Sequence, residues 1–178
     1  PPDIIHVHDW QTALVPALLH SAPHLYPELA RARTVLTIHN LGYQGRFWAN
    51  DWYLLNLDRR YFTPDFLEFY GDINYLKAGL LYADRVTAVS PRYAWEITTR
   101  EGGFGLHDVF QQLGDRFVGI RNGIDTRRWN PATDADITAH FDADNLSGKA
   151  KCKAALQRGW NLPVRAKVPV FGMSARLV

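Results

Sequence analysis

Residues 3–10 read DIIHVHDW, and this stretch decides the class of fold that the sequence predicts. Residues 4–8 are mostly apolar or β-branched and do not alternate cleanly with polar residues. Such a run is typical of a strand that is covered on both faces of a parallel sheet. The run then ends in His8, Asp9 and Trp10, three consecutive side chains that can form hydrogen bonds. The stretch therefore predicts an apolar strand with a polar end.

Residues 34–40, TVLTIHN, repeat this design and end in His39 and Asn40. Further strand-like runs alternate with helical patterns along the chain. Strands are expected at residues 4–8, 34–39, 85–89, 117–121 and 168–173, and helices at residues 11–21, 73–83, 93–99, 105–113 and 149–157. Strands that alternate with helices predict an α/β fold with a doubly wound parallel sheet.

Composition argues against several classes of protein. The chain has 178 residues, of which 47% are hydrophobic, enough for one ordinary core. Lys plus Arg number 20 and Asp plus Glu number 18, scattered along the sequence, so we expect no nucleic-acid partner. Cys152 is the only cysteine, which excludes an intramolecular disulfide. No long uncharged apolar run predicts a membrane span.

Polar residues follow several of the expected strands. His8, Asp9 and Trp10 follow the first, His39 and Asn40 the second, and an Asn-Gly-Ile-Asp turn that begins at Asn122 the fourth. In open α/β sheets, ligands bind in the crevice beyond the carboxyl ends of the strands. The sequence therefore predicts a site for a polar ligand above the sheet.

A metal site is one alternative, because His6 and His8 have a spacing that is common among metal ligands. The fuller pattern His-x-His-x-Asp-His would need Asp at position 10 and His at position 11, where Trp10 and Gln11 stand. The ligand set is thus incomplete for a metal centre. Alternate residues of a strand also share one face, which explains the pair without a metal. We expect no metal.

Each polar feature also has a plain structural explanation. A lone histidine such as His39 is often a structural residue bonded to a backbone carbonyl, and Asn122-Gly123 is a common tight-turn dipeptide. The glycines of residues 101–105 suit a loop between helices. Against the structural reading of His39, the glycines at 42 and 45 allow the following loop to approach a ligand closely. No single feature decides between these readings.

Longer stretches, taken together, resemble one family. They read HVHDW, TIHNLGYQGRF, NYLKAGLLYADRVTAVSPRYAWEITTREGGFGL, GIRNGIDTRRWNP, KCKAALQR and FGMSARL. In this order and spacing they resemble the bacterial glycogen synthases and plant starch synthases, which transfer glucose from a nucleotide-activated donor. The resemblance covers essentially the whole chain.

The resemblance implies a GT-B fold, in which two Rossmann-like domains face each other across a cleft. Residues 1–128 are then the second half of the N-terminal domain, residues 129–165 the interdomain connection, and residues 166–178 the start of the C-terminal nucleotide-sugar domain. The polar composition of residues 129–145 independently favours a linker. Both ends read as cut, so we expect a piece of a longer protein that is inactive by itself.

The implied reaction is retaining transfer of glucose from ADP-glucose to the non-reducing end of an α-1,4-glucan, without a metal or other cofactor. The resemblance matches Asp9, His39 and Asn122 to catalytic residues of the family. It matches Trp10, Asn40, Tyr43, Gln44 and Arg176 to substrate-binding residues, with the Arg176 guanidinium on the diphosphate. The aromatic residues 47–71 suit a wall beside the glucan, although aromatic rings are equally good core residues. The expected compartment is a bacterial cytoplasm, or a plastid in a plant or alga.

Two other interpretations stay open. One is a related GT-B glycosyltransferase that uses a different donor or acceptor, and the sequence does not decide between ADP and UDP. The other is a non-catalytic glucan-binding protein. Retention of Asp9, His39, Asn122 and Arg176 argues against the latter.

Overall fold

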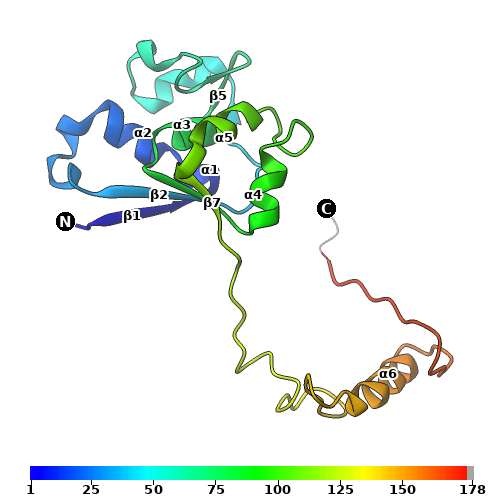
Figure 1. Cartoon of the computed structure of the whole chain (residues 1–178). Coiled ribbons are helices and arrows are strands. Elements are labelled where there is room, and N and C mark those ends of the chain that lie inside the picture. Colours follow the sequence, from blue (N-terminus) through cyan, green and yellow to red (C-terminus); the bar gives the residue numbers. More distant parts are fainter. Residues whose placement is uncertain (176–178) are drawn as a thin grey trace. The chain divides into compact units, whose positions relative to one another are not determined.

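The computed structural model describes residues 1–175 and divides them into two compact units (Figure 1). One unit is Pro1–Asn122, and the other begins at Gly123. The first unit contains the strands and the strand ends that the sequence singles out. Each unit is described by itself below.

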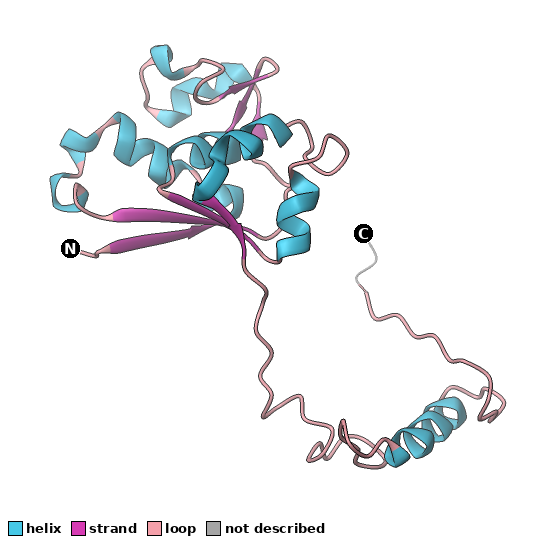
Figure 2. Cartoon of the chain, in the orientation of Figure 1, coloured by secondary structure: helices cyan, strands magenta, loops and turns pink. Residues whose placement is uncertain are grey.

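Four parallel strands form the main sheet of the first unit (Figure 2). Their spatial order is β1 (Ile4–His8), β2 (Arg33–Ile38), β6 (Arg85–Ala88) and β7 (Phe117–Gly119). The register pairs His8 with Thr37 and Ile38 with Ala88, so the carboxyl ends of the strands lie along one edge. The predicted parallel sheet is confirmed. Within residues 1–175 the four strands of this sheet follow one another in chain order.

Helices connect these strands close to where the sequence places them. They are α1 (Asp9–Thr12), α2 (Leu14–Ser21), α3 (Tyr75–Tyr82), α4 (Pro91–Ile97) and α5 (His107–Leu113). Short 3-10 helices lie at Pro23–Leu25, Pro27–Leu29, Ala49–Leu55, Arg59–Tyr61 and Gly114–Arg116. The predicted cap of α4 is confirmed, because the Tyr93 amide donates to Ser90 Oγ at 2.9 Å. The helix predicted at residues 11–21 is divided at Ala13 between α1 and α2.

The core lies between the sheet and its helices. Leu36 and Ile38 of β2 and Val86 of β6 are fully buried there. A Cβ on Gly79 of α3 would lie only 2.6 Å from the Ala13 carbonyl oxygen. Glycine at this position therefore lets α3 approach the junction of α1 and α2 more closely than any other residue would allow.

The aromatic residues 47–71 belong to a small substructure with its own sheet. Strands β3 (Arg46–Phe47), β5 (Asp72–Asn74) and β4 (Glu68–Phe69) pair antiparallel in that order. Trp52 and Phe66 lie in its core, whereas Trp48, Tyr53 and Tyr70 are exposed. Some of these rings are thus core residues, as the structural reading of the stretch allows.

Lys77 of α3 connects this substructure to the helix. Lys77 is only 6% exposed, and its Nζ donates hydrogen bonds to the carbonyl oxygens of Pro64 and Glu68. Burial lowers the pKa of Lys77, and the carboxylates of Glu68 and Asp65 oppose that shift. The ammonium group thus satisfies backbone carbonyls of a segment that has little regular structure of its own.

The second unit contains one helix, α6 (Ser147–Gly159), within the described residues. The predicted irregular segment at 129–145 has turns and bends but neither helix nor strand. The strand predicted at residues 168–173 is wrong: the described part of this segment forms no strand, and Phe171 and Met173 are 93% and 90% exposed. A strand needs a neighbour for its backbone groups, and none pairs with this segment within residues 1–175.

Candidate functional site

The candidate site lies at the carboxyl ends of β1 and β2. Because the register sets His8 beside Thr37, Asp9 and His39 follow these strands at the same edge of the sheet. The prediction that the two strand ends come together is confirmed. The loop of residues 39–45, hereafter the 39–45 loop, leads from β2 toward β3.

Asp9 is a support for this loop. Its Oδ1 accepts a hydrogen bond from the His39 amide at 2.7 Å and a longer one from the Asn40 amide at 3.4 Å. Its backbone has φ of 52°, a left-handed conformation that costs a residue with a Cβ about 1–2 kcal/mol. Non-glycine residues held in this conformation are concentrated at functional sites. Asp9 Oδ2 has no hydrogen bond within residues 1–175, which leaves one carboxylate oxygen for a ligand.

Hydrogen bonds both from other elements and from within the loop hold the 39–45 loop in place. The Leu41 amide donates to the Tyr93 hydroxyl of α4 at 2.8 Å. The Gly42 amide donates to Asn40 Oδ1 at 2.9 Å, so the predicted substrate-binding side chain of Asn40 closes a local turn with its oxygen. The loop is therefore fixed from several directions.

Gln44 is buried, at 8% exposure, although it was predicted to bind substrate. Its Oε1 accepts from Asn74 Nδ2 at 2.7 Å, and its Nε2 donates to the Phe104 carbonyl oxygen at 3.1 Å. Its backbone oxygen accepts from the Leu76 amide at 3.1 Å. The side chain thus joins the loop to the N-cap of α3 and to the glycine-rich loop of residues 101–105. With both ends of its amide occupied, Gln44 shapes the site by positioning the loop.

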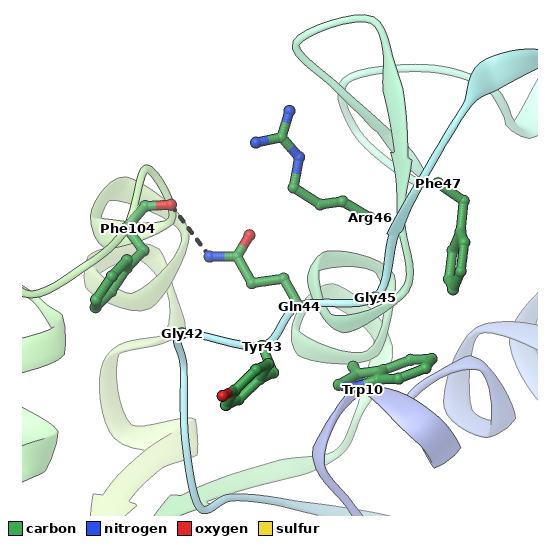
Figure 3. A pocket seen from close by; sticks show the side chains of 8 residues that line it. All are labelled: Trp10, Gly42, Tyr43, Gln44, Gly45, Arg46, Phe47 and Phe104. Atoms are coloured by element: carbon green, nitrogen blue, oxygen red, sulfur yellow. Dashed lines mark hydrogen bonds between the residues drawn. The ribbon is translucent and has the colours of Figure 1, made fainter. Parts of the chain in front are cut away.

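A pocket of about 620 Å³ opens beside the loop (Figure 3). Its walls carry four aromatic rings, two polar side chains and two glycines: Trp10, Tyr43, Phe47, Phe104, Gln44, Arg46, Gly42 and Gly45. Tyr43 and Phe104 are exposed at 64% and 60%. Flat apolar rings beside hydrogen-bonding groups suit a sugar, which has apolar ring faces and polar hydroxyl edges.

Trp10 forms the inner wall of this pocket. Its ring packs edge to face against Phe47, with ring centroids 5.7 Å apart. The centroid of the Tyr75 ring lies 6.4 Å from that of Trp10. Gly45, with φ of 63°, lies against the indole: a Cβ there would be 2.5 Å from Trp10 Cε3 (Figure 3). On the outer side, the Arg46 guanidinium donates to Asp72 Oδ2 at 2.7 Å.

Three histidines lie together beside Asp9. The rings of His6 and His8 stack at 4.3 Å between centroids, and His8 Nδ1 lies 3.0 Å from His39 Nε2. His6 Nε2 lies 2.7 Å from Thr37 Oγ1. Burial lowers the pKa of His6, and the positive charges that His8 and His39 can carry lower it further. The His-x-His pair is therefore used in contacts within the protein.

Two kinds of feature were not found within residues 1–175. No group of three or more His, Cys, Asp or Glu side chains in that range is arranged to hold a metal ion. No helix in the same range has the length and apolar character needed to cross a bilayer.

One predicted residue that the structure describes, Asn122, is not joined to this cluster. Asn122 is exposed and follows β7, which is separated from β2 by β6, and no hydrogen bond within the described residues links it to Asp9 or His39. Arg176 lies outside the described residues. The structure also places Arg46, Phe47 and Phe104 at the pocket. Phe47 begins the aromatic stretch that the sequence suggested as a wall beside the glucan, whereas Arg46 and Phe104 were missed. The glycines around Phe104 were the signal for that residue.

Comparison with known proteins gives one consistent result. Residues 1–112 match the family model described as the starch synthase catalytic domain. The chain is 48% identical over 176 residues to a glycogen synthase of Anaeromyxobacter sp. (strain Fw109-5), covering 99% of this chain and 37% of that protein. It is 49% identical over 175 residues to a glycogen synthase of Koribacter versatilis, covering 98% of this chain and 36% of that protein. The chain thus spans little more than a third of these curated relatives.

A solved structure agrees with the sequence matches. It is the catalytic domain of starch synthase IV from Arabidopsis thaliana bound to ADP and acarbose. The TM-score is 0.73 at 41% sequence identity, covering 89% of this chain and 33% of that one. The mixed α/β fold with its parallel sheet is therefore shared with a protein of known structure.

Proposed function

Because the chain belongs to the family of the starch synthase catalytic domain, we propose that it is part of a retaining glucosyltransferase. The reaction is transfer of glucose from ADP-glucose to the non-reducing end of an α-1,4-glucan. The observation that carries the proposal is the match over nearly the whole chain, combined with the joining of Asp9 and His39 at one edge of the sheet. The ADP and acarbose of the related solved structure support a nucleotide and a glucan-like ligand as substrates.

The residues of the strand ends divide the work in this proposal. Asp9, His39 and Asn122 act at the transferred glucose, and Trp10 and Tyr43 offer rings to the sugar faces. Asn40 and Gln44 act mainly through the 39–45 loop, because their side chains are bonded within the protein. Arg176 binds the diphosphate, and no metal or other cofactor is needed. A fixed cation suits that role because a guanidinium binds phosphate oxygens in a forked geometry.

The chemistry follows from positioning and charge. The bond between glucose and the diphosphate breaks through a transition state with positive charge on the sugar ring. The acceptor hydroxyl attacks from the same face and passes its proton to the departing diphosphate oxygen. The free Oδ2 of Asp9 provides negative charge near that ring, and the fixed loop holds the imidazole of His39 beside it. Prepositioned groups of this kind stabilise developing charge without having to reorganise during the reaction.

The chain covers parts of two domains in this proposal. Residues 1–128 are the second half of the N-terminal acceptor-side domain, residues 129–165 connect the domains, and residues 166–178 begin the nucleotide-sugar domain. The extent of the chain relative to its relatives supports this division, because they are almost three times longer. The two glycogen synthases named above are bacterial, which favours a bacterial cytoplasm over a plastid.

Transfer of radiolabelled glucose from ADP-glucose to glycogen tests the proposal. We expect turnover by the intact protein that contains this chain and none by residues 1–178 alone. In the intact protein, Asp9→Asn should lower kcat by at least about 100-fold, the order seen when one group that stabilises the transition state is removed. Asp3→Asn is the matched control, because the same change falls at the opposite end of β1. Asp9→Asn with full activity would contradict the role of Asp9. Transfer from UDP-glucose alone, or glucan binding without transfer, would favour the alternative functions.

A further inference from the structure

His8 contacts the imidazole that the proposed function places at the sugar. Its Nδ1 lies 3.0 Å from His39 Nε2, and the two rings are 5.3 Å apart between centroids with an interplanar angle of 41°. This distance is that of an ordinary N–H···N hydrogen bond. The contact joins the last residue of β1 to the first residue of the 39–45 loop.

Such a bond links the protonation of the two rings. A neutral imidazole has one N–H and one bare nitrogen, so one ring must donate and the other must accept. If His8 Nδ1 donates, a neutral His39 carries its proton on Nδ1; if His39 Nε2 donates, its Nδ1 is bare. In either case the bond occupies Nε2 and directs Nδ1 of His39, which has no hydrogen bond within residues 1–175, toward a different partner.

His8 is itself held in place. Its backbone amide and its carbonyl oxygen each bond to Thr12 Oγ1 at 2.7 Å. The ring of His8 also packs against the ring of His6. His6 Nε2 lies 2.7 Å from Thr37 Oγ1, which in turn lies 2.7 Å from Thr87 Oγ1, so these contacts run across β1, β2 and β6. A histidine whose backbone is bonded and whose ring packs against a second ring can orient its neighbour, in the way that outer partners fix the ring and tautomer of functional histidines.

We propose that His8 is a positioning residue that fixes the tautomer and the ring orientation of His39. The titratable groups that face this pair are His6 on β1 and Asp9 at the start of α1. Asp9 fixes the backbone of His39 through its amide, and His8 fixes the ring, so the two neighbours control different parts of one residue. The consequence for catalysis rests on the proposed function, whereas the hydrogen bond and the tautomer do not.

Nitrogen-15 NMR of the histidine rings tests the proposal on the 178-residue chain. We expect one dominant neutral tautomer of His39 at pH 8 in the parent chain and in His8→Asn, whose amide keeps a donor and acceptor near the Nδ1 position. We expect a mixture of both tautomers in His8→Phe, which keeps a flat ring but removes the nitrogen. His24→Phe is the control, because His24 is exposed on a 3-10 helix away from the strand ends.

An unchanged tautomer of His39 in His8→Phe would overturn the proposal. If that variant does not fold, scalar coupling between His8 Nδ1 and His39 Nε2 across the hydrogen bond decides it in the parent chain, and absence of coupling counts against it. In the intact protein, His8→Phe should lower kcat roughly threefold to tenfold, the size expected for one hydrogen bond, and His8→Asn should restore it. Inactivity of the unaltered intact protein would refute the proposed function and leave the tautomer result to decide the role of His8.

Discussion

Gly45→Ala is the sharpest test of how the pocket is built. Gly45 has φ of 63°, and an added Cβ would lie 2.5 Å from Trp10 Cε3 and 3.0 Å from Trp10 Cδ2. The left-handed backbone should cost alanine about 1–2 kcal/mol. Because the indole is a rigid ring and not a flexible chain end, forcing it aside should cost a further 1–3 kcal/mol or so, the usual range for an overpacked core. We therefore expect the free energy of unfolding to fall by about 2–5 kcal/mol.

Gly71→Ala separates the two contributions. Gly71 also has positive φ, at 85°, but a Cβ there would have no heavy atom within 4 Å. It should lose only the backbone part, about 1–2 kcal/mol. Urea unfolding followed by circular dichroism gives both values. In a Trp10→Ala background, the cost of Gly45→Ala should fall most of the way to that of Gly71→Ala, since the clashing ring is gone and only the Cβ of residue 10, at 3.2 Å, is left. Equal losses for the two glycine variants in the parent chain would refute the packing of Trp10 against Gly45.

Three further predictions concern the supports of the site. Tyr93→Phe should lower the free energy of unfolding by about 1–3 kcal/mol and speed hydrogen exchange at the Leu41 amide, because that buried amide loses its acceptor; unchanged exchange would count against the contact. Lys77→Met should destabilise the chain by about 1–3 kcal/mol in urea unfolding, because two carbonyl oxygens lose a charged donor, and Lys151→Met on exposed α6 serves as its control. The pKa of His6 is lower in the folded chain than in the unfolded chain, so the unfolded chain binds more protons below about pH 6.5 and stability should fall as pH falls through that region. His6→Gln should therefore flatten the dependence of Tm on pH, and a variant curve that runs parallel to that of the parent chain would contradict this.

The sequence was most informative where a feature depends on local residues. The strands of the main sheet were predicted because buried parallel strands are apolar along their length, and the cap of α4 because Ser90 and Pro91 carry their own signal. The meeting of Asp9 with the 39–45 loop followed from the rule that parallel strands end at one edge. The pattern alone therefore predicted that these two strand ends lie together.

Features that depend on distant partners were predicted less well. The helix expected from residue 73 begins at Tyr75, because residues 72–74 form β5, which pairs with β3 and β4 in a sheet that no local pattern indicated. The hydrogen bonds of the Gln44 amide to Asn74 and to the Phe104 carbonyl, 60 positions along the chain, were not predicted, whereas its place beside the ligand stays a prediction. The segment at 168–173 has the composition of a strand but has no strand beside it within the described residues.

The firm attachment of the 39–45 loop has a consequence for ligand affinity. A segment that becomes ordered only when its ligand binds loses conformational entropy at that moment, and this loss weakens the affinity. Here α1, α3, α4 and the 101–105 loop already immobilise the backbone, so the entropy is lost once, when the polypeptide folds. A sugar therefore binds to a pocket that is already preorganised, and less of the free energy of its contacts is offset by ordering the protein.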